Sequence, residues 1–167
     1  MQKIPNSALG RLSPEAFAAT EKYPVVVVLD NIRSLNNVGS FFRTCDAFAM
    51  ERIVLCGITA TPPNKEIHKT ALGAELTVRW DYEKLTTDAL QQLRGEGYTL
   101  LAVEQVEKAA RLTTFEVEKG KKYVSIFVGA VLWLAGARIG GHEQVSDRYW
   151  WVRHYDKRCR RNQHRHS

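Results

Sequence analysis

Residue types that could bind a phosphate or a ribose gather between residues 30 and 43. This short stretch contains three asparagines, two arginines and a glycine: Asn31, Asn36, Asn37, Arg33, Arg43 and Gly39. A guanidinium can hold a phosphate or a sugar through two parallel hydrogen bonds, and amide side chains supply both donors and acceptors. The stretch therefore predicts an anion- or sugar-binding site.

Two predicted elements would position these side chains. The run Val25–Leu29 is apolar and mostly β-branched, which is typical of a strand buried on both faces. A helix is expected from about Val38 to Met50, because apolar residues recur there at helical spacing: Val38, Phe42, Cys45 and Ala49. The loop between strand and helix would lie outside the carboxyl end of the strand, where open α/β sheets bind ligands.

The start of this helix has a predicted role of its own. We expect free N–H groups at Val38–Gly39, at the positive end of the helix dipole, to suit a phosphate. Arg43 follows one turn after Gly39 on the same side and could reach that phosphate. The structural alternative is that Asn31 and Asn37 cap a turn and the helix, and that Arg43 is an ordinary exposed arginine. Spacing alone leaves both interpretations open.

The rest of the chain alternates strands with helices. A short helix is expected to begin at Ser13-Pro14-Glu15 with Ser13 as its cap, and the Pro-containing segment 59–74 to close as a second short helix. Further strands are predicted at residues 53–57, 76–80, 99–105 and 123–128, and another helix at 87–94. This alternation predicts an α/β fold with a mostly parallel sheet.

Three segments resemble the SpoU/TrmH branch of the SPOUT methyltransferases, in the order in which that family has them. The first resembles motif 1, whose Asn, second Asn, Gly and Arg are matched by Asn31, Asn37, Gly39 and Arg43. The second is CGITATPPNKEIHKTALGAE (Cys56–Glu75), and the third is GYTLLAVEQ (Gly97–Gln105). The resemblance covers residues 9–127.

The resemblance implies a Rossmann-like α/β sheet closed by a C-terminal trefoil knot, working as a homodimer. It implies transfer of a methyl group from S-adenosylmethionine to a ribose 2′-hydroxyl of tRNA or rRNA. Arg43 and Asn37 would then be catalytic, and Asn31, Arg33 and Gly39 would contact the RNA. The cofactor residues would lie at the ends of the later strands: Val103, Glu104, Phe127, Val128 and Gly129.

The resemblance stops after Phe127. The family continues with a Gly-Asn-Glu motif and later a Ser-Leu-Asn run, whereas this chain continues with VGAVLW at 128–133 and has neither. These motifs belong to the family's knot and cofactor segments, so residues 128–167 do not themselves support the trefoil knot. We therefore divide the chain into an incomplete methyltransferase domain at 1–127 and a divergent segment at 128–167.

The divergent segment has two possible origins. Its composition changes abruptly, since it holds three of the four tryptophans and four of the five histidines. That change favours an out-of-frame translation over divergence toward a pseudoenzyme. The functional alternative to an enzyme is a non-catalytic RNA-binding protein that has lost the cofactor pocket.

The end of the chain is also basic. Residues 138–167 hold eight Lys or Arg against three Asp or Glu, and so carry most of the chain's net charge of +6. Such a tail can bind phosphate, and Trp150, Trp151 and Tyr155 resemble in composition a stacking platform for single strands. The simpler interpretation is a disordered basic tail. A zinc site is not expected, because the ligand types lack paired spacing: His142, His154, Cys159, His164 and His166.

Composition points to the cytoplasm and away from a membrane. No apolar run reaches about 18 residues, and the first residues lack the pattern of a signal peptide. The three widely separated cysteines, Cys45, Cys56 and Cys159, indicate free thiols in a reducing compartment. His68 is expected to be a surface residue rather than a catalyst.

Overall fold

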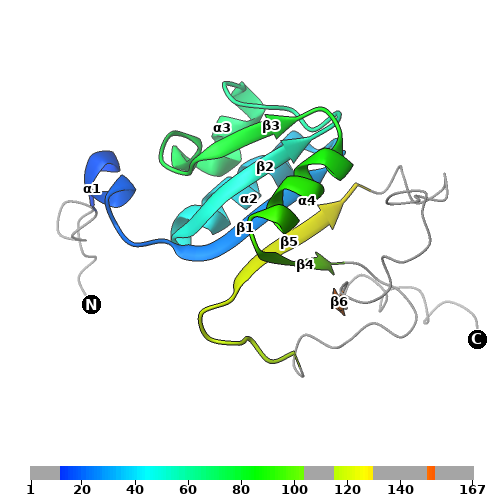
Figure 1. Ribbon diagram of the computed structural model, residues 1–167. Helices are drawn as coiled ribbons and strands as arrows, with labels where there is room; N and C mark the ends of the chain where they lie inside the picture. Colours follow the sequence, from blue (N-terminus) through cyan, green and yellow to red (C-terminus); the bar gives the residue numbers. More distant parts are fainter. Residues whose placement is uncertain (1–11, 104–114, 130–149, 153–167) are drawn as a thin grey trace, which may run out of the picture.

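The computed structural model describes residues 12–103, 115–129 and 150–152, and this part of the chain is an α/β fold (Figure 1). Its sheet has the strand order β3-β2-β1-β5-β4-β6. Every neighbouring pair is parallel, which confirms the predicted sheet. The strands are β1 (Tyr23–Asp30), β2 (Met50–Cys56), β3 (Trp80–Glu83), β4 (Tyr98–Val103), β5 (Lys122–Val128) and β6 (Trp150–Val152).

Helices cover both faces of this sheet. Figure 1 shows α4 in front of the sheet and α2 behind it, and α3 packs against α2. The three predicted helices outside the motif stretch are confirmed as α1, α3 and α4. The described helices are α1 (Pro14–Ala18), α2 (Leu35–Ala47), α3 (Lys65–Ala71), α4 (Thr86–Gly95) and the 3-10 turn η2 (Ala74–Leu76).

Strand β1 lies at the centre and contributes to a core on each face. Val27 and Leu29 pack with residues of α2 and α3, whereas Val26 and Val28 pack with residues of α4. Burying each such side chain contributes roughly 1.5–3 kcal/mol. The prediction of a strand buried on both faces is therefore confirmed.

Helix α2 begins earlier than predicted, at Leu35 rather than Val38. Ser34 is its N-cap: the Ser34 hydroxyl accepts the N–H of Asn37 at 3.3 Å, and the Ser34 carbonyl accepts the N–H of Val38 at 3.0 Å. The sequence pattern hides this start, because asparagine disfavours a helix interior. The prediction of free N–H groups at Val38–Gly39 is therefore wrong, since these residues lie inside the helix.

The apolar stripe of α2 is shorter than predicted. Val38, Phe42 and Cys45 are buried as expected. The helix ends at Ala47, and Ala49 has a φ of +47° in the turn that leads into β2. Ala49 and Met50 therefore do not belong to the helix.

The strand predicted at 76–80 lies later in the chain, because Ala74–Leu76 forms the turn η2 and β3 begins at Trp80. The Val78 N–H donates to the Ala74 carbonyl at 2.9 Å, and the Thr77 hydroxyl donates to Asp46 Oδ1 at 2.6 Å. Val78 is buried in the core beneath α2. The bond from Thr77 to Asp46 and the burial of Val78 are tertiary contacts, and they override the local preference of β-branched residues for a strand.

None of the described helices has the length and apolar character that a membrane crossing requires.

Candidate functional site

The predicted motif stretch lies where the sheet reverses its order. From β1 the chain moves outward through β2 to β3. It then crosses to β4 on the other half of the sheet, and β5 lies between β4 and β1 and pairs with both. The carboxyl ends of β1 and β5 therefore flank a topological switch point, which is where open α/β sheets bind ligands. The main chain closes there, because the Gly129 N–H donates to the Asp30 carbonyl at 2.8 Å.

Asn31 fixes the loop at the end of β1. It has a φ of +54°, a conformation that asparagine tolerates better than most residues. Its Oδ1 accepts the Ile58 N–H at 3.1 Å, and its Nδ2 donates to Asp30 Oδ1 at 2.5 Å. Asp30 is buried and also accepts the Thr86 hydroxyl at 2.5 Å. The Asn31 amide therefore joins the ends of β1 and β2, and Asp30 joins both to the start of α4.

Two further residues support this loop and were not predicted from the sequence. The buried Thr59 hydroxyl accepts the Ile32 N–H at 2.9 Å and donates to the Leu29 carbonyl at 3.0 Å. Gly57 has a φ of +62°, and a Cβ there would lie 2.3 Å from Asn31 Oδ1. The sequence signal for both was their position at the end of the strand predicted at 53–57, because that strand ends at the same edge of the sheet as β1.

Gly39 lies between two helices and is buried. A Cβ on Gly39 would lie 2.0 Å from Thr70 Oγ1 and 2.4 Å from the Ile67 carbonyl oxygen, so only glycine allows α2 and α3 to approach this closely. The Thr70 hydroxyl also donates to the Asn36 carbonyl at 3.0 Å. The structure thus gives Gly39 a packing role. Because Gly39 is buried, it offers little surface for the contact with RNA that the resemblance implied.

Arg33, Asn37 and Arg43 are exposed. Within residues 12–103, 115–129 and 150–152, no hydrogen bond or ion pair engages either guanidinium. Arg43 stands eight residues after the first residue of α2, about 12 Å along the helix, rather than one turn into it. Both arginines are therefore free to bind an anion.

The two predicted catalytic side chains leave α2 in different directions. Arg43 follows Gly39 by four residues and so shares the side of the helix that faces α3. Phe41 lies on the opposite side, where its ring centroid is 4.6 Å from that of Phe127 on β5. Asn37, six residues before Arg43, is turned from it by about 120° toward the Phe41 side. The structure therefore does not bring Asn37 and Arg43 together on one line of the helix.

Four predicted cofactor residues lie together at the carboxyl edge of β4 and β5. Val103 pairs in register with Phe127, and Val128 pairs with Asp30. Val103, Phe127 and Val128 are partly exposed and could form an apolar wall for S-adenosylmethionine. Gly129 cannot offer its N–H, which Asp30 already accepts. Glu104 lies outside the described residues.

The two thiols of the described residues are not nucleophiles. Cys45 and Cys56 are free and buried. Burial raises the pKa of each to about 12, so both stay protonated at neutral pH. Cys159 and the four histidines of the zinc alternative fall outside the described residues, and the described part contains no group of three or more potential metal ligands.

Comparisons with solved structures show the fold. The chain is similar to an AdoMet-bound rRNA methyltransferase from Sinorhizobium meliloti, with a TM-score of 0.64 and 20% identity, over 87% of this chain and 52% of that one. It is also similar to the A. aeolicus TrmH/SpoU tRNA modifying enzyme, with a TM-score of 0.60 and 17% identity, over 84% of this chain and 68% of that one. This chain thus spans about half the length of the Sinorhizobium protein.

The end of the chain matches a second family model. "Protein of unknown function (DUF2583)" matches residues 97–164. A curated relative, "Uncharacterized protein YchH" of Escherichia coli strain K12, is 83% identical over 42 residues, which are 25% of this chain and 46% of that protein. An out-of-frame translation would not be expected to match a family of natural proteins, so this match argues against that origin for the divergent segment.

The motif stretch and the strands β2 to β5 fall within one further match. The model of the SpoU rRNA Methylase family covers residues 24–130, which is more than half of the chain. It includes the loop held by Asn31, the exposed arginines and the carboxyl edge of β5, and it ends three residues after the predicted resemblance, which stops at Phe127. The chain therefore belongs to the SpoU rRNA Methylase family.

Proposed function

We propose that this chain transfers a methyl group from S-adenosylmethionine to a ribose 2′-hydroxyl of tRNA or rRNA in the cytoplasm. The observation that supports the proposal most is the exposure of Arg33 and Arg43 without a partner in the described part of the chain. Both lie on the loop and helix that follow the central strand. Arginines left free in this way suit the phosphates of a nucleic acid.

Arg43 would hold the target phosphate and stabilise charge that develops on the attacking oxygen. A guanidinium hardly deprotonates, so a water or a substrate phosphate would take the proton of the hydroxyl. Arg33 would contribute to RNA affinity through the backbone of the nucleic acid. Asn37 is exposed at the first turn of α2 and would contact the substrate there, whereas Asn31 and Gly39 would act by positioning the loop and the helix.

When bound, S-adenosylmethionine supplies the methyl group on a sulfonium, and Val103, Phe127 and Val128 would form part of its apolar wall. Phe41 and Phe127 meet on one side of α2, and Arg43 leaves the helix on the other. The helix would therefore separate Arg43 from a cofactor held at Phe127 of the same chain. This arrangement favours a homodimer in which Arg43 meets the cofactor of the second copy.

Two measurements on the full chain test the proposal. Calorimetry measures the binding of S-adenosylmethionine, and a single-turnover assay measures methyl transfer to tRNA and rRNA transcripts. Mass spectrometry of nuclease digests should place the new methyl group on a ribose. Methylation of a base instead would contradict the proposed reaction.

The second candidate function is RNA binding without catalysis. It is favoured by the SpoU match ending at residue 130 and by the second family model over 97–164. We propose a boundary near residue 127, after which the segment no longer carries the family's cofactor motifs. In that case the chain should bind S-adenosylmethionine weakly or not at all, while Arg33→Ala should still weaken RNA binding.

A further inference from the structure

A pocket lies on the side of α3 that faces away from α2. Its volume is about 800 Å³, within the range of sites for small ligands. Ile67, Thr70 and Ala71 face the α2 side, because they are the closest neighbours of Gly39. The pocket is lined instead by other residues of α3 together with η2, the start of β3 and the loop before α3.

The walls of this pocket are apolar and include one large aromatic ring. Trp80 is partly exposed and packs on its inner side against the core beneath α2. Pro62 and Pro63 form a second wall, and Leu76 is 80% exposed at the rim. A ring held by the core and open on its other side is a platform on which a flat ligand can stack.

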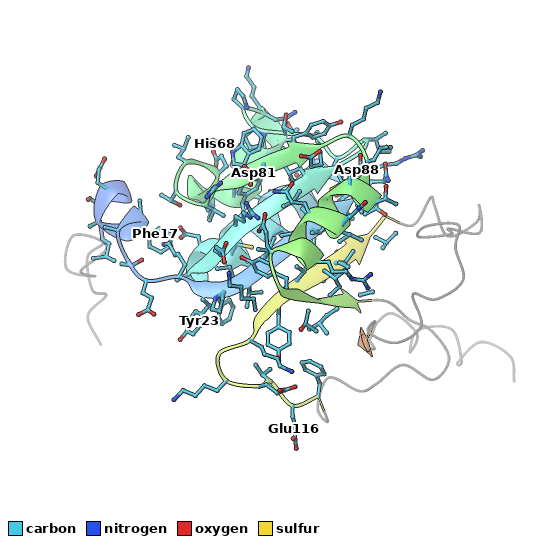
Figure 2. All side chains as sticks on the ribbon, viewed as in Figure 1. Phe17, Tyr23, His68, Asp81, Asp88 and Glu116 are labelled. Atoms are coloured by element: carbon cyan, nitrogen blue, oxygen red, sulfur yellow. The ribbon has the colours of Figure 1, made fainter. Side chains whose placement is uncertain are left out.

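The polar residues that line the pocket include a histidine, two lysines, an asparagine and a glutamate: His68, Lys65, Lys69, Asn64 and Glu75. Figure 2 labels His68 on α3, beside the edge strand β3. His68 Nδ1 bonds to Glu75 Oε1, and Glu75 is buried, with its side chain 7% exposed. The carboxylate can only accept, so Nδ1 donates and Nε2 is the nitrogen left for a ligand. Lys65 and Lys69 stand exposed at the same rim, where Lys69 also pairs with Glu66 at 2.5 Å.

We propose that this pocket binds an unpaired nucleobase of the RNA substrate, stacked on Trp80, with His68 Nε2 at the base edge and Lys65 near its phosphate. The inference rests on the proposed RNA substrate. Arg43 leaves α2 on the side of α3, and the pocket lies across α3, roughly one helix diameter or 10 Å away. A single strand whose phosphate is held by Arg43 could therefore continue over α3 and place a flanking base in the pocket.

The first experiment detects the base in the pocket without using catalysis. The full chain, labelled at its tryptophan indoles, is titrated with adenosine 5′-monophosphate and, separately, with ribose 5-phosphate, and Trp80→Phe identifies the Trp80 signal. The proposal expects the nucleotide to shift the Trp80 indole signal and the sugar phosphate to leave it in place. No shift with the nucleotide, or equal shifts with both probes, would overturn it.

The second experiment measures affinity for a short single-stranded RNA. Trp80→Leu keeps apolar bulk against the core but loses the ring, and it should weaken binding about 5- to 100-fold. Trp80→Phe should keep most of the affinity. Phe48→Leu is the matched control, because Phe48 is an aromatic ring that is 63% exposed away from the pocket, and its affinity should not change. Melting curves confirm that each variant folds.

The outcomes separate this inference from the proposed function. Methyl transfer that persists with unchanged RNA affinity in Trp80→Leu would refute the pocket and leave the enzyme intact. Loss of affinity in Trp80→Leu, in a chain that transfers no methyl group at all, would support the pocket and contradict the proposed reaction.

Discussion

The arginines in two regions of this molecule differ in their surroundings. Arg52, near the amino ends of the strands, is buried and pairs with Asp81 at 3.3 Å and with Glu96 at 2.8 Å. Arg33 and Arg43, on the loop and helix after β1, are exposed and have no partner within the described residues. The paired arginine contributes to the fold, whereas the unpaired arginines are available to a ligand.

The tyrosine next to Arg52 reinforces this contrast. Tyr98 donates its hydroxyl to the Glu51 carboxylate at 2.7 Å, and burial, followed by this hydrogen bond, raises the pKa of Tyr98 to about 12. Arg52 and Glu51 thus both have partners near the amino end of the sheet. If this contrast is functional, substitution of Arg52 should lower stability. Substitution of Arg33 or Arg43 should instead lower RNA binding or activity and leave stability nearly unchanged.

The largest effect on stability is expected for Gly39→Ala. Its Cβ would lie 2.4 Å from the Ile67 carbonyl oxygen, so α2 and α3 would have to move apart, at a cost of about 3 kcal/mol. Gly95→Ala is the matched control, because a Cβ on Gly95 meets nothing within 4 Å. Urea denaturation of both variants measures the difference. Similar stability for the two would show that the contact between α2 and α3 is not tight.

A smaller loss of stability is expected for Arg52→Ala. Removing the guanidinium leaves two carboxylates near the sheet without their partner and should lower the free energy of unfolding by about 2 kcal/mol. That figure is below the value for a fully buried pair, because Asp81 and Glu96 are both more than one-third exposed. Arg43→Ala should leave stability within about 0.5 kcal/mol of the unchanged chain. Equal losses in the two variants would remove the contrast between the two regions.

Arg33→Ala should change RNA binding but not folding. An arginine that contacts phosphate releases counterions, so its removal should lower the slope of log affinity against log salt by about 0.7 to 0.9. Filter binding at several salt concentrations measures that slope. Lys84→Ala, an exposed residue after β3, is a control that should leave the slope unchanged.

The smallest effect concerns Glu75 at low pH. Burial alone would raise the pKa of this carboxyl, but the hydrogen bond from His68 and those from the backbone outweigh burial and lower it below the ordinary value of 4.5. Glu75 therefore stabilises the fold fully above about pH 4.5, and this contribution is lost as the pH falls through the lowered pKa.

Glu75→Gln should flatten the acid limb of the stability curve below pH 4.5. Glu116→Gln, at an exposed carboxylate labelled in Figure 2, is the control and should leave that limb unchanged. Thermal melts from pH 3 to pH 6 provide the measurement. An unchanged acid limb in Glu75→Gln would mean that the bond to His68 does not hold the carboxylate in its charged form.

Sequence reasoning predicted the parts of the fold that depend on local pattern. The run Val25–Leu29 gave the central strand, and the spacing of Val38, Phe42 and Cys45 gave the buried face of α2. The start of α2 was missed, because Ser34 caps it ahead of two asparagines that disfavour a helix. The position of β3 was missed because contacts of Thr77 and Val78 with distant residues decide it.

The sequence pointed to the stretch that forms the candidate site but not to its geometry. The motif stretch identified Asn31, Asn37, Gly39 and Arg43, yet spacing could not show that Gly39 is buried against α3. Only the packing of α3 on α2 reveals which side of the helix Arg43 takes. Thr59 was missed for a similar reason, since its hydrogen bonds to Leu29 and Ile32 join segments far apart in the sequence.

The central claim is that the unpaired Arg43 acts on RNA, and single-turnover methyl transfer tests it most directly. The assay compares Arg43→Ala, Arg43→Lys and Arg52→Ala with the unchanged chain, and in parallel with a version in which the family's Gly-Asn-Glu and Ser-Leu-Asn motifs are restored. In whichever version is active, Arg43→Ala should lower the rate about a hundred- to a thousandfold. Arg43→Lys should also be slow, because an ammonium cannot form the bidentate contact, and folded Arg52→Ala should keep its rate. Near-normal turnover in Arg43→Ala would contradict the account and make Arg43 an ordinary surface arginine.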